Sequence, residues 1–488
     1  MSAKPTFLWY DLETFGLDPA YDRIAQFAAR RTDADLNPIG DPVVLYCRLS
    51  ADYLPDPASC LVTGITPQTV RARGMRESDF IERINAMMSE RNTCTCGFNS
   101  LNFDDEFIRN TLYRNLMDPY EREYRNGCSR WDIIDLVRAA HDLRREGINW
   151  PNPGAKGNPV FKLTELTAAN RIEHTGAHDA MADVDATIEV ARLIKEKQPN
   201  LFAYYLNLRN KNEVKDLLRI QDVPVPLIHV NRIFTNRYGC SSLIVPITPC
   251  LGQENSIICF NLAYDPTPLF SINGGDVFRT PGLFKLAMNK SPFLAQMNTL
   301  KYDDYKRLGI DYHSCMSRYK AIMDRRSLLI TKLRQEEVLP PVPDDPDFQI
   351  YGKFFSDYDR NLFSVVRNTP VDQKLSLNLR FNDPRGEKMV WRHVCRNWPE
   401  SIVPEQLKKW KDFSINRLIC PPERFPDNSG RKAANILAFK RRINERLADT
   451  TLPKRDRDIL QSLLEYHDSL RKYLNFPELS ESSPSATE

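Results

Sequence analysis

The first fifty residues alternate between short apolar runs and turn-forming residues. Runs at 6–13, 24–30 and 43–49 are rich in aromatic and aliphatic side chains, and Gly16 and Pro19 interrupt the chain after the first run. Apolar runs at such short spacing predict three strands that pair as an antiparallel meander.

The pattern then changes to a helical period. Apolar side chains recur every three or four positions over 77–89 and 104–116, which predicts two helices, and residues 93–98 between them predict a short strand. The run 131–137 predicts either a further strand or the start of a helix. Strands that alternate with helices are typical of the α/β class.

The first domain is expected to end with a helix. Residues 149–159 are rich in Pro, Gly and Asn, which predicts a loop, and a helix is expected to start at Leu163. Helical spacing predicts another helix over 179–196, and Pro199 lies just beyond it, where a stop signal is common. We therefore expect an α/β domain over residues 1–198.

The remainder of the chain predicts two further domains and a tail. Over 199–350, short apolar runs alternate with turns, which predicts a small β-barrel with helical insertions, and the proline-rich segment 338–346 predicts a stiff linker. Apolar stripes at helical spacing predict an α-helical domain over 351–476. Ser, Glu and Pro dominate residues 477–488, so we expect a disordered tail there.

Composition places the chain among globular proteins. Of its 488 residues, 42% are hydrophobic and 27% are charged. No apolar run approaches the roughly 18 residues that cross a membrane, and no secretion signal is recognisable. The eleven cysteines show no CxxC spacing. We therefore expect a soluble, cytoplasmic protein with reduced cysteines.

Charge alone does not indicate a partner. The net charge of +3 arises from 67 basic and 64 acidic residues, so any nucleic-acid surface would have to be local. Residues 431–473 hold eleven Lys and Arg against six Asp and Glu. We interpret this segment as a solvated helix face rather than as a dedicated binding surface.

Two acids lie at the end of the first predicted strand. Alternate side chains of a strand point to the same face, so Asp11 and Glu13 would stand about 6.6 Å apart along it. Two such acids gain little from facing a core, but they suit a divalent cation such as Mg²⁺ or Mn²⁺, which prefers carboxylate oxygens. The alternative is a solvated strand end that carries two surface acids.

Two later segments place acids at helix starts. Asp104 opens the helix predicted at 104–116, where it could be a favourable first-turn acid or a third carboxylate directed at the same metals. Asp179 is expected to cap the next helix, with His178 in the lead-in loop and Asp183 about one turn inside. A lone histidine is more often structural, but an imidazole beside carboxylates supplies a base that titrates near neutral pH.

Together these residues resemble the three motifs of the DEDD exonuclease superfamily, histidine subclass. The resemblance rests on the order and spacing of five residues, Asp11, Glu13, Asp104, His178 and Asp183. Longer stretches, among them 61–68 and 147–151, resemble the bacterial exonuclease I family, and weaker similarity continues to 354–360. This family implies a ribonuclease H-like domain, a barrel resembling a Src-homology-3 domain and a helical C-terminal domain.

The resemblance also implies an activity, the stepwise 3′-to-5′ removal of nucleotides from single-stranded DNA with release of 5′-mononucleotides in DNA repair and recombination. Two Mg²⁺ ions about 3.5–4 Å apart would clamp the scissile phosphate, and Mn²⁺ is a substitute. By resemblance, Asp11, Glu13 and Asp183 hold the first ion, and Asp11 and Asp104 position the second. His178 takes the proton of the attacking water.

Substrate contacts and partners follow from the same resemblance. The implied substrate-binding residues are Glu13, Arg109, Tyr120, Tyr124, Arg138 and Lys162. Relatives carry tryptophan where this chain has Tyr124, which still stacks on bases, and arginine where it has Lys162, which loses the bidentate grip. The implied partner is single-stranded DNA-binding protein, docked through its acidic tail, and we expect a monomer.

Two other functions share these motifs. A 3′-to-5′ exoribonuclease of the same superfamily would carry the same catalytic residues, and a non-catalytic single-strand-binding module could retain the fold. A purely structural role would leave the acidic clusters unexplained. The additional domains favour DNA, and they would allow processive degradation if they arch over the substrate groove.

Overall fold

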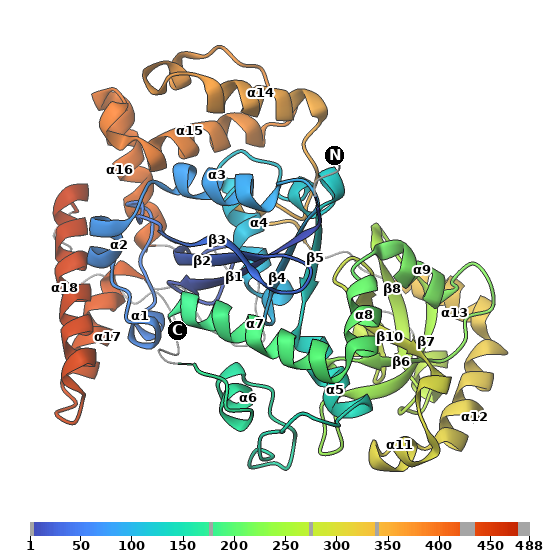
Figure 1. The fold of residues 1–488 in the computed structure, drawn as a ribbon. Helices are drawn as coiled ribbons and strands as arrows, with labels where there is room; N and C mark the ends of the chain where they lie inside the picture. Colours follow the sequence, from blue (N-terminus) through green and yellow to red (C-terminus); the bar gives the residue numbers. More distant parts are fainter. Residues whose placement is uncertain (1–3, 175–178, 273–276, 337–340, 420–434, 477–488) are drawn as a thin grey trace.

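Two five-stranded sheets and a group of helices follow one another along the chain in the computed structural model (Figure 1). The structure describes residues 4–174, 179–272, 277–336, 341–419 and 435–476. The tail expected at 477–488 lies outside these residues. Among the helices so described, none combines the length and the apolar character needed to cross a membrane.

The first sheet has the strand order β3-β2-β1-β4-β5. Its strands are β1 (Thr6–Thr14), β2 (Ile24–Thr32), β3 (Pro38–Tyr46), β4 (Thr93–Gly97) and β5 (Ser129–Asp132). The first three are antiparallel, which confirms the predicted meander, and β4 and β5 run parallel to β1. The prediction of 43–49 for β3 was wrong in its bounds. As an edge strand, β3 tolerates Pro38 and Pro42, whose missing N–H groups the sheet does not require.

Helices cover both faces of this sheet. Residues of α3 (Glu77–Met88) and α4 (Asp104–Arg114) pack on one face, and residues of α7 (Ala180–Lys197) pack on the other. The other helices before the second sheet are α1 (Pro57–Thr63), α2 (Pro67–Arg73), α5 (Ile134–Leu143), α6 (Leu163–Ala169), α8 (Pro199–Asn207) and α9 (Lys211–Leu218), of which α9 contacts the second sheet. The helices predicted at 77–89, 104–116 and 179–196 are confirmed. The run at 131–137 contains both predicted elements, because β5 ends within it and α5 begins within it.

The alternation of side chains along β1 decides which residues face which layer. Leu8 and Tyr10 pack into the cluster that contains residues of α3 and α4, whereas Phe7 and Trp9 pack into the cluster that contains residues of α7. Asp11 continues the second series. The polar end of β1 is therefore directed toward α7, which crosses below the sheet in Figure 1.

The second sheet is antiparallel throughout, in the order β10-β6-β7-β8-β9. Its strands are β6 (Leu227–Val230), β7 (Ser241–Cys250), β8 (Gln253–Asn261), β9 (Leu283–Ala287) and β10 (Phe293–Gln296). Among the described residues, α10 (Thr267–Phe270) interrupts the strands. The longer helices α11 (Tyr302–Arg307), α12 (Tyr312–Met323) and α13 (Arg326–Glu336) follow the last strand instead of being inserted.

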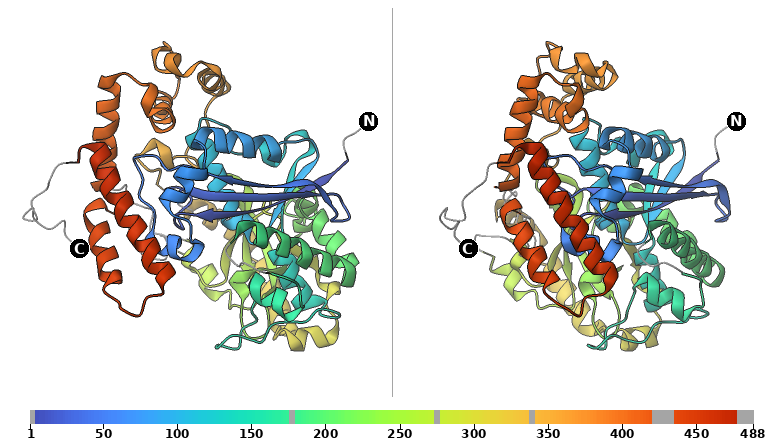
Figure 2. Two further views of the ribbon diagram at one scale, coloured as in Figure 1. Left: turned by 60° about the vertical axis from the view of Figure 1, so that its left-hand side comes forward. Right: turned by 90° about the vertical axis from the view of Figure 1, so that its left-hand side faces the viewer.

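The C-terminal region is helical, as predicted. It contains α14 (Asp357–Asn368), α15 (Arg385–Asn397), α16 (Pro404–Ile419), α17 (Ile436–Leu447) and α18 (Lys454–Leu474). The last two lie side by side (Figure 2), and Ile436, Phe439 and Leu463 pack into one cluster with Tyr53 and Cys60 of the first domain. Helices α17 and α18 therefore cover the outer side of α1 and α2.

The segment predicted as a stiff linker ends in a buried ion cluster. Its residues 338–340 lie outside the described residues, but Asp345 and Asp347 pair with Arg417, each at 3.1 Å. Arg396 pairs with Asp347 and, at 2.9 Å, with Asp52 of the first domain. The end of this segment is thus fixed against two domains, because its acids find buried arginines there.

Candidate active site

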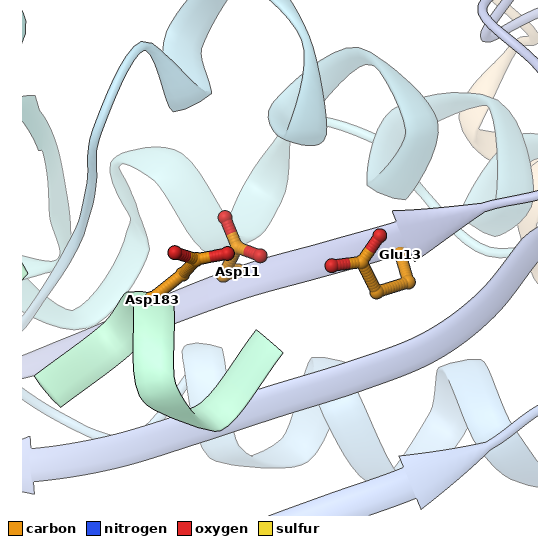
Figure 3. A group of neighbouring side chains, drawn as sticks. All are labelled: Asp11, Glu13 and Asp183. Atoms are coloured by element: carbon orange, nitrogen blue, oxygen red, sulfur yellow. The ribbon is translucent and has the colours of Figure 1, made fainter. Parts of the chain in front are cut away.

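Three carboxylates from two elements converge beside the end of β1. Asp11 and Glu13 project from β1, and Asp183 lies in the first turn of α7 (Figure 3). One oxygen from each side chain lies within 4.8 Å of the other two. The side chain of Asp179 caps α7 as predicted, by accepting a hydrogen bond from the N–H of Met181.

The fourth predicted acid lies at the start of α4. Asp104 is buried, and its Oδ1 accepts a hydrogen bond of 3.1 Å from the N–H of Leu12, between the two acids of β1. Its negative charge raises the pKa of both Asp11 and Glu13. Asp104 therefore shares the electrostatic environment of the three converging carboxylates.

The neighbouring Asp105 has a different role. Burial alone would raise its pKa, but the guanidinium groups of Arg122, Arg130 and Arg109 hold it well below the usual range. Arg122 pairs with Asp105 at 2.5 Å, and Arg130 also contacts it. Of the two adjacent acids, Asp105 therefore fixes the loop that follows α4. Asp104 is the one that is left to act as a ligand in the candidate active site.

Burial, together with repulsion between carboxylates, raises the pKa values of the acidic cluster. Burial and the charges of Asp183 and Asp104 raise the pKa of Glu13 to about 8. Burial also raises the pKa of Asp104 to about 8, and loss of hydration together with the neighbouring carboxylates holds the pKa of Asp11 well above its usual range. A divalent cation would remove this repulsion, and an all-oxygen donor set fits Mg²⁺ or Mn²⁺.

A second histidine belongs to the site. His174 lies nine residues before Asp183, and its Nε2 is 2.7 Å from Asp183 Oδ1. Its Nδ1 lies 3.3 Å from the hydroxyl oxygen of Thr167. The sequence prediction missed His174, although its place in the loop before α7 was a usable signal. His178, the predicted base, lies outside the described residues.

A buried acid also holds the turn that precedes α4. Asp132, at the end of β5, accepts hydrogen bonds from the N–H groups of Asn99 (2.8 Å) and Leu101 (3.1 Å). Asn99 adopts a left-handed conformation with φ of 63°, which asparagine tolerates better than most residues. The sequence prediction did not include Asp132. Its contacts direct the start of α4, and with it Asp104, toward β1.

The residues predicted to contact DNA differ in how exposed their side chains are and in whether they already have partners. Tyr124 and Lys162 are exposed. Tyr120 is half-buried, and its hydroxyl donates to the carbonyl of Ile350 over 3.3 Å. The side chain of Arg109 is buried and pairs with Glu123 at 2.7 Å.

Arg138 is also paired rather than free. Its Nη1 lies 2.6 Å from Asp135 Oδ1, and its side chain is largely buried. An arginine held in this way can contact a phosphate only by exchanging or sharing its carboxylate partner. Of the implied contacts, Tyr124 and Lys162 therefore need the least rearrangement to meet a substrate.

Comparison with known proteins gives matches along most of the chain. Three family models match: Exonuclease over residues 8–191, Exonuclease I SH3-like domain over 209–336, and Exonuclease I C-terminal domain over 344–470. Exodeoxyribonuclease I of Escherichia coli (strain K12) is 40% identical over 438 residues, which cover 86% of this chain and 91% of the relative. The Haemophilus influenzae (strain ATCC 51907 / DSM 11121 / KW20 / Rd) protein of the same name is 38% identical over 85% of this chain and 90% of its own length.

Solved structures match equally well. E. coli exonuclease I in complex with a dA16 oligonucleotide has a TM-score of 0.87 at 36% identity, over 96% of this chain and 100% of that chain. A moderately thermophilic exonuclease I from Methylocaldum szegediense has a TM-score of 0.86 at 39% identity, over 96% of this chain and 99% of that chain. These matches confirm the predicted fold class, a ribonuclease H-like domain followed by an SH3-like domain and a helical C-terminal domain. The chain belongs to the exonuclease I family.

Proposed function

We propose that this chain is an exodeoxyribonuclease that removes nucleotides one at a time from the 3′ end of single-stranded DNA and releases 5′-mononucleotides. The convergence of Asp11, Glu13 and Asp183 within 4.8 Å is the observation that carries the proposal. Two-metal nucleases place cations at the scissile phosphate, and a buried cluster of oxygen donors is suited to hold them. Similarity to exodeoxyribonuclease I over 86% of the chain supports DNA as the substrate.

Each residue of the cluster has a separate task in this proposal. Asp11, Glu13 and Asp183 hold one divalent cation, and Asp11 with Asp104 positions a second. The bound cations would supply the positive charge that stabilises the pentacovalent phosphate and the leaving 3′ oxygen. His178 accepts the proton of the attacking water, for which an imidazole is suited near neutral pH. Glu13 also contacts the terminal nucleotide.

We propose Mg²⁺ as the working cation, with Mn²⁺ as a substitute. The donor set supports this choice because it contains carboxylate oxygens and no thiolate. A relative, E. coli exonuclease I bound to single-stranded DNA, has also been solved in a zinc-bound form. Hydrolysis measured in Mg²⁺, Mn²⁺ and Zn²⁺ at matched concentrations would identify the working cation.

The path of the DNA is proposed from the residues that surround the cluster. Tyr120 and Tyr124 stack on bases, and Lys162 contacts a phosphate as a point charge. Arg109 and Arg138 bind phosphates of the strand after they exchange their carboxylate partners for these phosphates. Base stacking and phosphate contacts are both indifferent to sequence, which suits an enzyme that must degrade any strand.

A product analysis tests the function directly. A 5′-labelled single strand should shorten one nucleotide at a time from its 3′ end, and the released nucleotides should carry 5′-phosphates. Blunt duplex DNA should be degraded much more slowly. Asp183→Ala should abolish turnover while binding to the strand persists. Unchanged turnover in Asp183→Ala would overturn the site assignment.

A second candidate function is 3′-to-5′ exoribonuclease activity. An oligoribonuclease of Neisseria meningitidis serogroup B (strain ATCC BAA-335 / MC58) is 29% identical over 205 residues, which is 40% of this chain and 94% of the relative. Digestion of matched DNA and RNA oligonucleotides separates the two functions. Faster digestion of RNA than of DNA would establish the exoribonuclease.

We also propose the setting in which the enzyme acts. The domains 1–198, 199–350 and 351–476 work as one monomeric enzyme, in which a single chain brings Asp11, Glu13 and Asp183 together. Ten buried cysteines among the described residues are thiols, which supports a reducing, cytoplasmic location. A solved structure that pairs SSB with exonuclease I supports single-stranded DNA-binding protein as the partner, with a role in DNA repair. Binding of that protein's acidic tail peptide tests this.

A further inference from the structure

A short segment of the second domain contacts the exonuclease domain close to the start of α4. Residues 289–291, which we call the docking segment, lie between β9 and β10. Arg130 of β5 donates to the carbonyl of Asn289 over 2.9 Å, and Ser291 Oγ donates to the carbonyl of Arg130 over 3.1 Å. The middle residue of the segment, a lysine, pairs at 3.1 Å with Glu106 of α4. The second domain is therefore bound to two elements that lead to the acidic cluster.

Tyr205 of α8 lies at the centre of this contact, between the two sheets (Figure 1). Its hydroxyl oxygen is 2.8 Å from the carbonyl oxygen of Ser291 and 3.1 Å from that of Asp132, at the end of β5. The side chain is buried, and burial raises the pKa of Tyr205 well above its usual range, so the hydroxyl keeps its proton. This single proton is shared by two carbonyls that belong to different domains.

The side chain of Asp132 continues the contact to the turn before α4. Its Oδ1 accepts hydrogen bonds from the N–H groups of Asn99 (2.8 Å) and Ile134 (3.0 Å), and its Oδ2 accepts one of 3.1 Å from the N–H of Leu101. Asn99 has a φ of 63°, a conformation that persists in residues other than glycine only where the surroundings hold it. Helix α4 begins with Asp104, three residues after Leu101.

These contacts form one path from the second domain to a carboxylate of the candidate active site. The path runs from the docking segment through the Tyr205 hydroxyl to Asp132, and from there through the turn to Asp104. Asp104 in turn accepts the N–H of Leu12, between the two acids of β1. Displacing a reacting group by about 1 Å can lower activity roughly 100-fold, so the support of this turn has consequences for hydrolysis.

The neighbouring Tyr204 shows what a purely structural contact of α8 would be. Its hydroxyl donates over 2.7 Å to the carbonyl of Leu294 in β10, so this residue also joins α8 to the second domain. The hydrogen bond of Tyr204 connects α8 with β10 and does not involve β5. The two adjacent tyrosines therefore make similar contacts between domains, but the contact of Tyr205 continues to Asp132.

We propose that Tyr205 is a positioning residue for Asp104, which it holds in place through Asp132 and the turn before α4. The second domain thereby sets where the exonuclease domain presents this carboxylate to the second cation. The inference rests on the proposed function and deepens it, because it makes the second domain part of the support of the cation site. Loss of the Tyr205 hydroxyl should weaken the second cation and leave the first cation in place.

Cation binding by the full-length chain tests this directly. Electron paramagnetic resonance counts the Mn²⁺ ions bound in the presence of a phosphorothioate oligonucleotide that resists hydrolysis, and the parent should bind two. Tyr205→Phe keeps the ring and should weaken one of the two ions by about 2- to 10-fold, the effect of one lost hydrogen bond. Asp132→Asn should weaken the same ion by about 10- to 100-fold. Tyr204→Phe is the matched control and should bind both ions like the parent.

Two further measurements separate positioning from structural support. In Tyr205→Phe, kcat for single-strand hydrolysis should fall while KM for the strand stays unchanged, because no strand contact is removed. Without any cation, the amides of Asn99 and Leu101 should exchange hydrogen faster in Tyr205→Phe than in the parent or in Tyr204→Phe. Adding Tyr205→Phe to Asp132→Asn should cause little further loss, since both residues act along one path.

The outcomes separate the positioning role from the proposed function. If the parent hydrolyses DNA but Tyr205→Phe matches it in Mn²⁺ binding and kcat, the positioning role is wrong and the function stands. If the parent hydrolyses no DNA but Tyr205→Phe still weakens one Mn²⁺ ion and speeds amide exchange, the positioning role stands and the function is wrong. Equal losses in Tyr204→Phe, or equal weakening of both ions in Tyr205→Phe, would show that the hydroxyl only joins the domains and would overturn the proposal.

Discussion

The hydrogen bond between His174 and Asp183 gives one carboxylate of the cluster a fixed orientation. In the tautomer with its proton on Nε2, the ring donates to Asp183 Oδ1 over 2.7 Å, and the other oxygen remains available to a cation. Partners of this kind orient metal ligands, and their loss commonly costs about 10- to 100-fold in metal affinity or activity.

His174→Ala should therefore raise the Mg²⁺ concentration required for half-maximal hydrolysis by about 10- to 100-fold. His174→Gln should recover part of this loss, because its amide can donate to the same oxygen. Hydrolysis measured across a Mg²⁺ titration checks both variants. A lower unfolding temperature with an unchanged Mg²⁺ requirement would mean that His174 only supports the loop.

Cation binding should also release protons. The pKa values of Glu13 and Asp104 are raised to about 8, whereas unfolded glutamate and aspartate titrate at about 4.3 and 3.9. Without cations, these two carboxyls thus bind more protons in the folded protein than in the unfolded chain between about pH 4 and 8, and their contribution to stability falls as pH rises through this window.

Calorimetry at pH 7 can detect this release. The heat of Mg²⁺ binding should depend on the ionisation enthalpy of the buffer, because protons leave Glu13 and Asp104 as the cation binds. The dependence should shrink in Glu13→Gln and also at about pH 10, where Glu13 and Asp104 are already ionised. Equal heats in all buffers at pH 7 would contradict the raised pKa values.

At the scale of the element, α4 begins with two adjacent acids in different environments. Asp104 lies beside the acidic cluster, and Asp105 lies among arginines. Asp105→Asn should lower the free energy of unfolding by about 3–5 kcal/mol, because Arg122 and Arg130 would lose their buried partner. Asp104→Asn should abolish hydrolysis without a comparable loss of stability, because burial already disfavours the charged form of Asp104.

Urea unfolding in cation-free buffer, together with hydrolysis assays, compares these two variants. They are matched in chemistry and differ by one position, so each is the control for the other. Equal stability losses would show that both acids serve the same buried ion network, contrary to their contacts.

The helices and strands were predicted well because the spacing of apolar residues is a property of each local segment. The antiparallel meander, α3, α4 and α7 follow from residues within each segment, and the alternation along β1 places Asp11 and Glu13 on one face. The predicted bounds of β3 were wrong because the strand includes prolines. A strand tolerates proline at the edge of a sheet, and the edge position is not a local property of the sequence.

Other features of the site depend on contacts that no local pattern encodes. The sequence shows that His174 lies in the loop before α7, but it does not show that the ring meets Asp183. Motif position assigned the ligand role to Asp104, but the reason that Asp105 is unsuited to it appears only with the folded loop, which brings Arg122 and Arg130 onto it. Contacts between residues that lie far apart in the sequence can be seen only in the folded structure.

At the scale of the whole molecule, two polar junctions connect the domains. The Tyr205 hydroxyl oxygen lies 3.1 Å from the carbonyl oxygen of Asp132 and 2.8 Å from that of Ser291, which joins α8 to β5 and to the segment before β10. Arg396 of α15 donates to Asp52 over 3.0 Å and pairs with Asp347. The second junction fixes the C-terminal domain against the exonuclease domain.

The Asp52–Arg396–Asp347 junction should weaken in acid. Burial alone would raise the pKa values of Asp52 and Asp347, but Arg396 and neighbouring arginines hold both below the usual range. Carboxylates with depressed pKa values stabilise the fold above the unfolded pKa of about 3.9, and this stabilisation is lost as pH falls below it.

Asp347→Asn should lower the free energy of unfolding at pH 7 by about 3–5 kcal/mol, because it leaves Arg396 and Arg417 short of a buried partner. It should also flatten the loss of stability below about pH 4, since one of the titrating groups is gone. Asp344→Asn is the matched control, because Asp344 is exposed in the same segment. Urea unfolding of all three proteins at a series of pH values measures both effects. If the parent and Asp347→Asn lose stability in parallel as pH falls, the acid sensitivity arises elsewhere in the molecule.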